Sequence, residues 1–401
     1  MSEVIPVKVS IVRGGTSKGI FILENELPKD PVLRDKYILE IFGSPDVRQI
    51  DGLGGADVLT SKLAIIGPSS REDADVDYTF GQVSFVEEKI DYKSNCGNIS
   101  AGVGPFAIDH CLVKAVEPFT TVRIHQVNTD TIINAKVEVR DGKAAVNGDL
   151  HIDGVPTLGS TIELDFSDSV GGITGKLLPT GSVTDEIVTG DGKTYLVSVV
   201  DAGIPTVFIR AEALGLVGTE TPSRIEGDSA LMEKIEEIRG RCAVIMGFTD
   251  KWTNAVADCP YAPFFAMVSP SQSYHTFDGK DVAADDIDIV SRLVFMQKMH
   301  KTHPVTGTVC MATAARIPGN IVYETISQRG RENRQLMIGH PAGKIPAVSV
   351  MEQENGALKL RTAAILRTAR TILDGTVYVR KSRVELVADS QRAFQKNLKN
   401  C

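Results

Sequence analysis

The chain has 401 residues, of which 42% are hydrophobic and 23% are charged, as in ordinary globular proteins and unlike disordered, fibrous or membrane proteins. It carries 43 Lys and Arg against 51 Asp and Glu, and the resulting net charge of -8 argues against a polyanion bound by a broad basic face. We therefore expect two domains and no nucleic-acid partner.

The cysteines and the apolar runs bear on the cellular compartment. Six cysteines occur without a C-x-x-C pair, so we expect reduced thiols rather than a zinc or thioredoxin-like site. The sequence does not open with a basic segment followed by an apolar run, and no stretch reaches the roughly 18 apolar residues of a membrane span. We expect a cytoplasmic protein without a membrane partner.

The first part of the sequence predicts strands with one surface helix. Residues 7–15 alternate like a half-buried strand, a polar loop spans residues 14–19, and the apolar residues 21–23 resume the sheet. Residues 30–42 have a proline near the start and a glycine after the end, which predicts a capped helix. The apolar run 62–66 predicts a buried strand.

Tight turns then indicate antiparallel sheet. Alternating runs over residues 78–85, 121–139 and 144–166 are punctuated by Asp-Gly and Asn-Gly pairs. Residues 171–189 are rich in Gly, Thr and Ser, and we predict that the passage between two halves lies there.

The second half repeats this mixture of elements. Predicted strands lie at residues 195–200, 206–210 and 264–269. A helix is predicted near residues 228–239, and another over residues 283–303, where acidic residues come first and basic residues last. A final helix is predicted at residues 362–373, followed by a strand at residues 376–380.

Two segments differ from these amphipathic surface helices. Residues 98–112 and 308–315 have many small residues and almost no charge, so each predicts a helix buried on nearly every side. One such helix in each half indicates an internal duplication: an α+β fold of two pseudo-symmetric domains, each a curled, mostly antiparallel sheet around a central helix. We place the first domain at residues 1–184, with residues 376–401 as a strand that completes it, and the second at residues 185–375.

The strongest local signal is the S-N-C-G-N segment at residues 94–98, which places Cys96 at the start of a buried helix. Free N–H groups and the helix dipole at that position favour a thiolate and also a neighbouring substrate carboxylate. The alternative is a buried thiol that only packs, and the residues alone leave both interpretations open. Cys310 has apolar neighbours beside the second buried helix, so we expect its thiol to pack.

Two further segments suggest polar chemistry. Lys62 stands at the edge of an apolar strand, where partial desolvation favours the neutral amine that can act as a base; the alternative is a lysine that extends from a strand end into solvent. The segment R-G-G-T-S-K-G at residues 13–19 offers N–H groups, hydroxyls and cations. It suits either an oxyanion-binding turn or a plain hairpin loop.

Three other kinds of motif, for nucleotides, metals and hydrolases, are incomplete in this sequence. Residues 52–57 lack the third glycine of the dinucleotide fingerprint, and residues 171–176 lack the spacing of a phosphate-binding loop. His300 and His303 have no further ligand at a recognisable spacing, and no hydrolase signature surrounds Cys96. We expect no nucleotide, no metal and no other cofactor.

Ordered motifs match one known family across nearly the whole sequence. They read R-G-G-T-S-K-G, D-G-L-G-G-A-D-V-L-T-S-K, S-N-C-G-N-I-S-A-G-V-G-P-F-A-I-D, H-K-T-H-P-V-T-G-T-V-C and A-R-I-P-G-N. The sequence thereby resembles the PrpF-like isomerases. That family includes methylitaconate Δ-isomerase, 2-methylaconitate cis-trans isomerase and 4-oxalomesaconate tautomerase, and it is similar in fold to diaminopimelate epimerase.

The resemblance implies an active site in a cleft between the two helix N-termini, with proton transfer centred on Lys62 and Cys96. Epimerase relatives use two cysteines, one from each half. This sequence departs from that pattern, because its second helix opens with Thr306-Gly307-Thr308 and Cys310 falls deeper.

The expected reaction is an allylic proton shift in a small unsaturated di- or tricarboxylate. A base removes a proton beside the double bond, the charge spreads onto a carboxylate, and protonation at the far carbon completes the isomerisation. We assign Lys62 as the base and Cys96 as its partner. Candidate carboxylate contacts are Thr16, Ser17, Asn95, Gly97, Asn98, Gly307 and Thr308.

Several functions stay open at this point. Methylitaconate, giving dimethylmaleate, ranks above 2-methylaconitate and oxalomesaconate as the expected substrate. An amino-acid epimerase or racemase that depends on a second thiol, and a non-catalytic ligand-binding protein, are the more distant alternatives. The sequence leaves the oligomeric state open, a homo-oligomer included.

Overall fold

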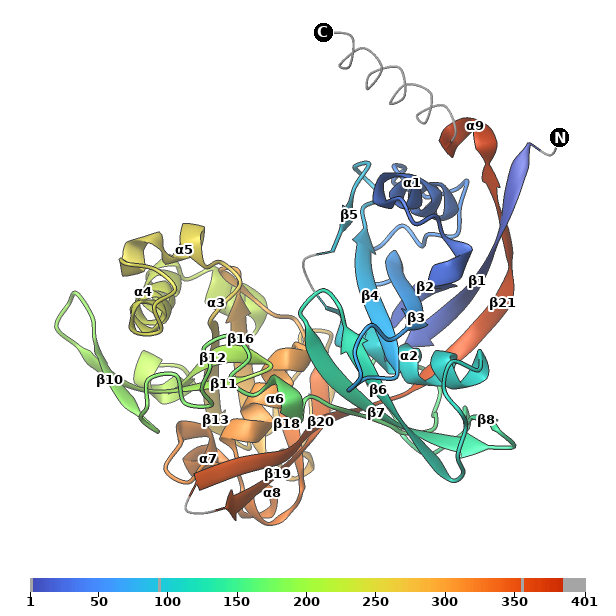
Figure 1. Cartoon of the computed structure of the whole chain (residues 1–401). Coiled ribbons are helices and arrows are strands. Elements are labelled where there is room, and N and C mark those ends of the chain that lie inside the picture. Colours follow the sequence, from blue (N-terminus) through green and yellow to red (C-terminus); the bar gives the residue numbers. More distant parts are fainter. Residues whose placement is uncertain (1–2, 93–94, 355–356, 385–401) are drawn as a thin grey trace, which may run out of the picture. The chain divides into compact units, whose positions relative to one another are not determined.

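The structure is a computed structural model that describes residues 3–92, 95–354 and 357–384 (Figure 1). The chain forms two compact units. The first comprises Met1–Ile162 and Arg367–Cys401, and the second comprises Glu163–Leu366. The boundaries between the two units therefore lie after residues 162 and 366. The sequence analysis places the domain boundaries after residues 184 and 375.

The described part of the first unit contains a curled sheet and three α-helices. Its strands are β1 (Val4–Gly14), β2 (Ser17–Leu23), β3 (Lys62–Pro68), β4 (Val76–Val83), β5 (Ile90–Asp91), β6 (Phe119–Gln126), β7 (Thr131–Arg140), β8 (Lys143–Ala144) and β21 (Ala369–Arg380). Its helices are α1 (Pro31–Phe42), α2 (Gly97–Asp109) and α9 (Lys381–Val384). The short strand β9 (Ile162–Asp165) begins at the boundary between the units.

From the β1–β2 pair onward, the strands of this unit pair alternately antiparallel and parallel. β21 and β1 are antiparallel, β1 and β2 antiparallel, and β2 and β3 parallel. The order then continues with antiparallel β3–β4, parallel β4–β6 and antiparallel β6–β7. β5 forms a short antiparallel partner on the end of β4.

The helix α2 lies within the curl of this sheet. Every residue from Ile99 to Ile108 is buried, and α2 contacts β1, β2, β3, β4, β6 and β7. Small residues permit this close packing: a Cβ on Gly102 would lie 2.7 Å from the Phe21 ring, and one on Gly104 would lie 2.9 Å from a Val137 methyl group. The prediction of a helix buried on every side is confirmed for this segment.

The second unit contains the remaining strands, one pair of which forms a separate two-stranded sheet. Its strands are β10 (Asp185–Val188), β11 (Thr194–Ala202), β12 (Ile204–Arg210), β13 (Phe264–Pro270), β14 (Tyr274–His275), β15 (Asp281–Val282), β16 (Ile289–Phe295), β17 (Lys298–Met299), β18 (Gln335–His340), β19 (Gly343–Glu354) and β20 (Ala357–Arg367). Its helices are α3 (Pro222–Glu226), α4 (Ser229–Ile245), α5 (Ala255–Asp258), α6 (Val305–Ala314), α7 (Ile321–Thr325) and α8 (Gln328–Glu332).

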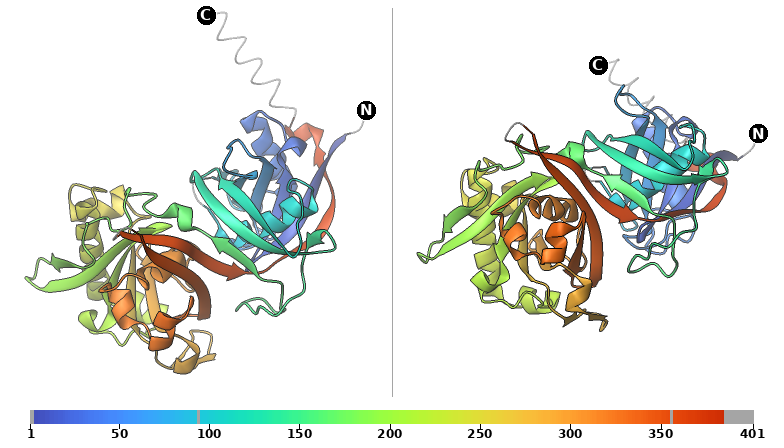
Figure 2. Two further views of the ribbon diagram at one scale, coloured as in Figure 1. Left: turned by 60° about the horizontal axis from the view of Figure 1, so that its bottom comes forward. Right: turned by 90° about the horizontal axis from the view of Figure 1, so that it is seen from below.

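The second unit repeats the pairing pattern of the first. β11–β12 is antiparallel, β12–β13 parallel, β13–β16 antiparallel, β16–β18 parallel and β18–β19 antiparallel. α6 follows the hairpin β16–β17 as α2 follows the hairpin β4–β5. Gly307 to Ala314 are all buried within the surrounding strands, which Figure 2 shows around the orange helix. Two pseudo-symmetric domains, each a curled sheet around a central helix, are therefore confirmed.

The surface helices α1 and α4 form where the sequence predicts them. Asp30 caps α1 by accepting a hydrogen bond from the Leu33 N–H, and Gly43 ends it in the left-handed conformation. Asp228 caps α4 in the same way through the Leu231 N–H.

The helix predicted over residues 283–303 is wrong, because this segment forms β16 and β17. The charged residues at its start serve tertiary contacts instead of a helix dipole: Asp288 accepts hydrogen bonds from Ser327 and Arg329, and Asp286 pairs with Lys344. The run from Ile289 to Phe295 is almost entirely buried between β13 and β18, where apolar β-branched side chains favour a strand.

The helix predicted at residues 362–373 is also wrong. These residues form the end of β20 and the start of β21, which pair with β19 and β1. Ala, Leu and Arg favour helix intrinsically, but hydrogen bonding to two neighbouring strands outweighs a preference of a few tenths of a kcal/mol per residue.

The loop predicted at residues 14–19 is shorter than expected, since β1 ends at Gly14 and β2 begins at Ser17. No helix in the described part of the chain combines the length and apolarity needed to cross a bilayer.

Gly102→Ala tests the close packing of α2. The new methyl group would approach Phe21 and Val12 within 3.0 Å, so overpacking of about 1–3 kcal/mol should exceed the roughly 1 kcal/mol that alanine gains in a helix. We expect lower stability in urea unfolding. Gly190→Ala is the control, because its methyl group would lie 3.5 Å from the nearest atom, Glu237 Oε1. Equal stability of the two variants would contradict this account.

Candidate active site

Cys96 is the N-cap residue of α2. Its carbonyl accepts hydrogen bonds from the Ser100 N–H at 2.9 Å and the Ser100 hydroxyl at 3.1 Å. Within the described residues its thiol makes no capping hydrogen bond, and Cys96 is half-buried rather than enclosed. The thiol therefore stands where the free N–H groups of a helix start favour a negative charge. Ser94, the first residue of this motif, lies outside the described residues.

The β1–β2 turn packs directly on the first turn of α2. A Cβ on Gly14 would lie 2.2 Å from the Asn98 carbonyl oxygen, and one on Gly15 would lie 2.2 Å from Asn98 Oδ1. Gly15 also has a φ of +50°, so both positions require glycine. The Asn98 Nδ2 group donates to the Thr16 hydroxyl at 3.1 Å, which brings two of the predicted binding residues into contact.

Ser17 faces the same helix. It pairs with Gly14 across the β1–β2 hairpin, and paired residues point to the same face of a sheet, here the face covered by α2. Ser17 is 2% exposed, and its hydroxyl has no hydrogen-bond partner among the residues that the structure describes. Burying a hydroxyl without a partner costs free energy, so this group is available to a ligand.

Asn95 and Gly97 flank the thiol. Asn95 Oδ1 accepts a hydrogen bond from the Ser100 hydroxyl at 3.1 Å, which fixes the chain just before the helix. Gly97 is the first residue of α2 and is half-buried. The structure thus gathers Thr16, Ser17, Asn95, Gly97 and Asn98 around the helix start that carries Cys96.

Lys62 opens β3 and is 8% exposed. Its Nζ donates to Gln82 Oε1 at 2.9 Å and lies 5.4 Å from the centre of the Phe80 ring. Gln82 Nε2 donates to the Ser61 carbonyl at 3.0 Å, which turns the amide oxygen toward the lysine. Sequence reasoning missed Gln82, because only the pairing of β3 with β4 places it opposite Lys62.

The glycine-rich segment before Lys62 wraps around a buried glutamine. Gln49 Oε1 accepts hydrogen bonds from the Ser61 hydroxyl and the Ala56 N–H, both at 2.7 Å. A Cβ on Gly54 would lie 2.2 Å from the Gln49 side chain. The glycines therefore allow close packing that holds Ser61 and, next to it, Lys62.

Arg367 is a further residue at the start of α2. It is 5% exposed, and its Nε donates to Asn98 Oδ1 at 3.2 Å. Burial lowers the pKa of its guanidinium to about 10, while the negative charge of Cys96 acts in the opposite direction. Sequence reasoning missed this arginine because it falls in the segment predicted as the last helix.

The start of α6 reproduces the start of α2. The Pro304 carbonyl accepts hydrogen bonds from the Thr308 N–H at 2.8 Å and the Thr308 hydroxyl at 2.9 Å, as Cys96 does from Ser100. His303 Nδ1 lies 2.8 Å from the same hydroxyl, in the place of Asn95. The second helix therefore has Pro304 where the first has its thiol.

The predicted binding residues of α6, Gly307 and Thr308, lie two positions deeper in their helix than Gly97 and Asn98 do in α2. A Cβ on Gly307 would lie 2.8 Å from Leu293, and the Thr308 hydroxyl bonds to Pro304 and His303. Thr306 is the second residue of its helix, as Asn98 is of α2. Neither composition nor spacing signals this shift, which becomes visible only when the two helix starts are aligned by their hydrogen bonds.

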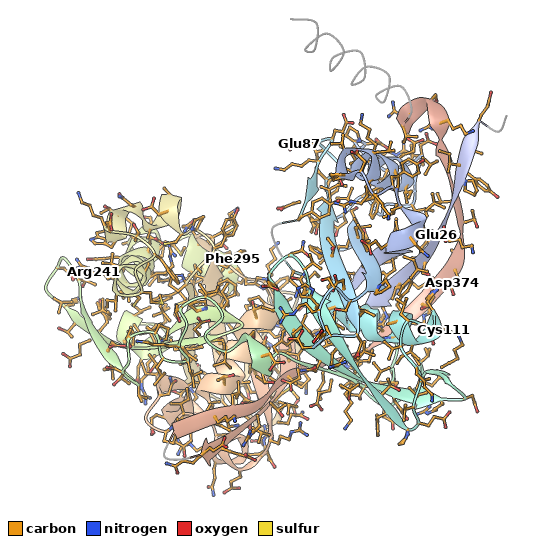
Figure 3. All side chains as sticks on the ribbon, viewed as in Figure 1. Glu26, Glu87, Cys111, Arg241, Phe295 and Asp374 are labelled. Carbon is orange, nitrogen blue, oxygen red and sulfur yellow. The ribbon has the colours of Figure 1, made fainter. Side chains whose placement is uncertain are left out.

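The strands that carry Lys62 and its counterpart also correspond. β3 and β13 both have seven residues, the same burial pattern and a final proline, which places Phe264 in the position of Lys62. Phe264 meets Phe295 edge-on at 5.1 Å, where the first unit has Lys62 and Gln82 (Phe295 is labelled in Figure 3). The polar pair and the N-cap thiol thus both belong to the first unit.

A family model described as PrpF protein matches residues 4–380. The chain belongs to the PrpF family. Its named relatives include isomerases, so by sequence it is an isomerase.

Individual members of the PrpF family match over almost their full length. The 3-methylitaconate isomerase of Eubacterium barkeri is 52% identical over 96% of this chain and 100% of the relative. The 2-methyl-aconitate isomerase of Shewanella oneidensis is 38% identical over 94% of this chain and 98% of the relative. A crystal structure of methylitaconate-delta-isomerase, 52% identical, superposes with a TM-score of 0.89 and covers 96% of this chain and 98% of that one.

The other cysteines of this PrpF-family chain have different surroundings. Cys310 is fully buried and its thiol donates to the Val200 carbonyl at 3.2 Å, so the expectation that it packs is confirmed. Burial raises the pKa of Cys310 to about 12 and that of Cys242 to about 12. Cys111 is exposed just beyond α2 (Figure 3), and Cys401 lies outside the described residues.

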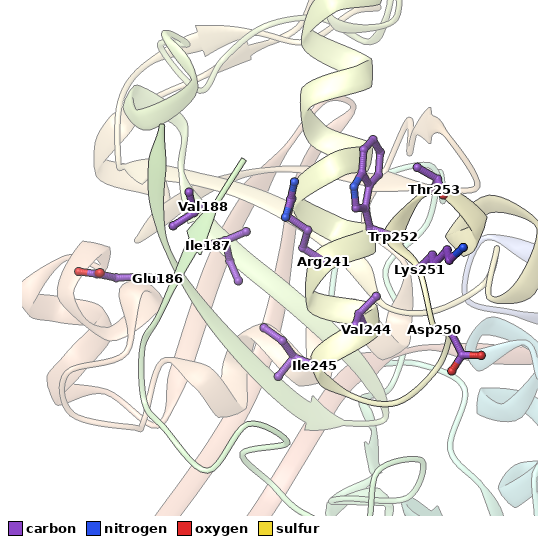
Figure 4. Close-up of a pocket in the computed structure, with 10 residues that line it drawn as sticks. All are labelled: Glu186, Ile187, Val188, Arg241, Val244, Ile245, Asp250, Lys251, Trp252 and Thr253. Carbon is purple, nitrogen blue, oxygen red and sulfur yellow. The ribbon is translucent and has the colours of Figure 1, made fainter. Parts of the chain in front are cut away.

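A groove of about 530 Å³ lies on the second unit between β10 and α4 (Figure 4). It is lined by Glu186, Ile187, Val188, Arg241, Val244, Ile245, Asp250, Lys251, Trp252 and Thr253. Lys62, Cys96 and the predicted binding residues are not among these, so the groove is separate from the candidate site.

In the described residues no group of three His, Cys, Asp or Glu side chains could hold a metal ion.

His303 makes the stability of the second unit depend on pH. It is 4% exposed, and burial lowers its pKa well below the ordinary 6.5, with His340 and His300 adding to the effect. The unfolded chain therefore takes up the proton first, so stability is complete above about pH 6.5 and falls below it by up to about 1.4 kcal/mol per pH unit.

His303→Asn, which copies Asn95 of the first unit, should flatten this decline. Urea unfolding at pH 7.5 and 5.5 measures it, with the exposed His151→Asn as the control. A decline as steep in His303→Asn as in the unaltered protein would show that His303 is not its source.

Proposed function

We propose that this PrpF-family isomerase moves the double bond of methylitaconate to give dimethylmaleate without a cofactor. The observation that carries the proposal is the 52% identity, over nearly the whole chain, with the 3-methylitaconate isomerase of Eubacterium barkeri. Lys62 and Cys96 support it, because each stands in surroundings suited to proton transfer. 2-Methylaconitate ranks second and oxalomesaconate third.

The reaction needs one proton removed and one returned. Loss of the proton beside the double bond leaves a dienolate whose charge spreads onto the adjacent carboxylate, and a proton added at the terminal methylene carbon completes the shift. Atoms and charge balance without an oxidant or reductant. The difficult step places further charge on a dianion, so fixed N–H and O–H donors are needed where that charge develops.

The surroundings of the two residues suggest which one acts first. Gln82 offers Lys62 an oriented acceptor, and the Phe80 ring lies near its Nζ, and both features favour the ammonium form. Cys96 stands at the N-terminus of α2, a position where a helix favours a negative charge. The sequence suggested Lys62 as the base; we now assign proton removal to Cys96 and proton donation to Lys62.

The first unit offers a set of donors for the substrate carboxylates. The Ser17 hydroxyl, which has no hydrogen-bond partner among the described residues, and the N–H groups at Gly97 and Asn98 lie at the start of α2, close to Thr16. We assign no carboxylate contact to the Thr308 side chain, because its hydroxyl is engaged by Pro304 and His303.

Proton NMR in deuterated water tests this proposal. The purified protein is incubated separately with methylitaconate, 2-methylaconitate and a proline control, and each sample is followed for a new alkene that carries deuterium. We expect dimethylmaleate labelled in its new methyl group. Lys62→Ala and Cys96→Ala should each lower the rate at least about a hundredfold, as removal of a general acid or base does.

Two variants control for nonspecific effects. Lys89→Ala and Cys111→Ala remove an exposed lysine and an exposed cysteine from the same unit and should keep full activity. Conversion of 2-methylaconitate alone would replace the substrate, and exchange of only the proline α-proton would replace the reaction with an epimerisation. No exchange in any sample would reject an allylic isomerase of methylitaconate or 2-methylaconitate.

A further inference from the structure

Lys62 lies against two side chains of the strand beside it. β3 and β4 are antiparallel, and their register sets Lys62 directly opposite Gln82. The Lys62 Nζ donates to Gln82 Oε1 at 2.9 Å and lies 5.4 Å from the centre of the Phe80 ring. Residues two apart on a strand share a face of the sheet, so both contacts come from one face of β4. The lysine, 8% exposed, is therefore packed against this strand rather than extended into solvent.

The contacts of the Gln82 amide define its orientation. Its Nε2 donates to the Ser61 carbonyl at 3.0 Å, while its Oε1 faces the Lys62 Nζ. A reversed amide would set its NH2 group against the lysine amine and its oxygen against a carbonyl oxygen, and both hydrogen bonds would be lost. Ser61 is held in turn by Gln49, whose Oε1 accepts from the Ser61 hydroxyl at 2.7 Å. The acceptor for Lys62 thus has a fixed position.

The Asn128 side chain anchors β4 at Phe80. Asn128 Oδ1 accepts a hydrogen bond from the Phe80 N–H at 2.8 Å, and Asn128 Nδ2 donates to the Phe80 carbonyl at 2.9 Å. Both backbone groups of Phe80 are therefore bound by one side chain. The aromatic ring near the Lys62 Nζ and, two residues further on, Gln82 both project from this anchored backbone.

The second unit has the same strand pair without the lysine. Aligning the registers of β13–β16 and β3–β4 sets Phe264 in the position of Lys62 and Phe295 in the position of Gln82. The two phenylalanine rings meet edge-on at 5.1 Å. The strand pair therefore forms with an apolar side chain in place of the glutamine, and of the two units only the one with the lysine has an amide opposite it.

We propose that Gln82 is a positioning residue, which holds the Lys62 Nζ in place for proton transfer to the substrate. A lysine side chain is long and flexible, so without this acceptor its Nζ would spend less time at the reacting carbon. The direction of transfer rests on the proposed function, in which Cys96 removes a proton and Lys62 donates one to the terminal methylene carbon. Solvent then returns a proton to the amine and accepts the one held by the thiol, so the balance is complete. The fixed position of Lys62 requires no substrate.

Nuclear magnetic resonance of the lysine ammonium groups tests the fixed position directly. Protein labelled with 15N-lysine is measured at pH 6.5 and 25 °C, where ammonium protons open to water exchange rapidly and those in buried hydrogen bonds exchange slowly. We expect a signal from Lys62, assigned by its absence in Lys62→Ala. Gln82→Met keeps the side-chain length without the strong acceptor and should lose this signal, whereas Gln82→Glu keeps an acceptor and should retain it.

Exchange compared with conversion gives a second readout, in deuterated water with methylitaconate. Removal and return of a proton at Cys96 labels methylitaconate beside its double bond, whereas delivery from Lys62 gives dimethylmaleate. In Gln82→Met we expect conversion to fall at least about tenfold and exchange to fall less, so the ratio of exchange to conversion rises. A purely structural loss would lower both in proportion and leave the ratio unchanged.

A glutamine outside the site provides the matched control. Gln353→Met alters an exposed residue of β19 and should change neither the Lys62 signal nor the ratio. If Gln82→Met does not fold, as judged by circular dichroism, Gln82→Asn takes its place, because the shorter side chain draws the acceptor away from the Lys62 Nζ.

The outcomes separate this inference from the proposed function. The inference would be overturned by an unaltered protein that gives no Lys62 signal, by an equal signal in the Gln82 variant, or by a ratio of exchange to conversion that does not rise. A signal lost in the Gln82 variant of a protein that converts no tested dicarboxylate would uphold the fixed position of Lys62 and reject the proposed function instead.

Discussion

The whole structure depends on enclosing two helices that have no polar face. α2 is buried from Ile99 to Ile108 and α6 from Gly307 to Ala314, so each needs a sheet curled around it to be stable in water. Glycine at positions such as Gly102 lets strands approach the helix directly. A helix held on all sides cannot shift, and its first N–H groups therefore provide a fixed electrostatic site.

Both units share this arrangement of a sheet curled around a helix, but they carry different side chains at equivalent positions. Equivalent positions hold Cys96 and Pro304 at the helix starts, and Lys62 and Phe264 at the strand starts. The hydrogen bonds of Ser100 and Thr308 are the same in both units, which shows that this arrangement does not require a thiol or a lysine. The helix and strand starts of the first unit could therefore form without Cys96 or Lys62.

The sequence predicted what local pattern encodes. An uncharged run of small residues marked α2 and α6, and the motif around Cys96 placed the thiol at a helix start. It could not predict Gln82 or Arg367, which reach Lys62 and Asn98 from 20 and 269 positions away. The two wrongly predicted helices failed for different reasons. The charges of residues 283–303 follow the order of a helix dipole but make tertiary contacts, and residues 362–373 favour helix locally but pair with neighbouring strands.

The pairing of β1 with β21 determines which unit can finish folding first during synthesis. Val4 to Gly14 lie against Ala369 to Arg380, so the first unit lacks a full-length neighbour of β1 until the ribosome has made the last strand. The second unit is continuous from Glu163 to Leu366 and has all its strands before then. Synthesis from the N-terminus thus finishes the unit that carries Lys62 and Cys96 last, and the nascent chain acquires the contact of Arg367 with Asn98 only in that final step.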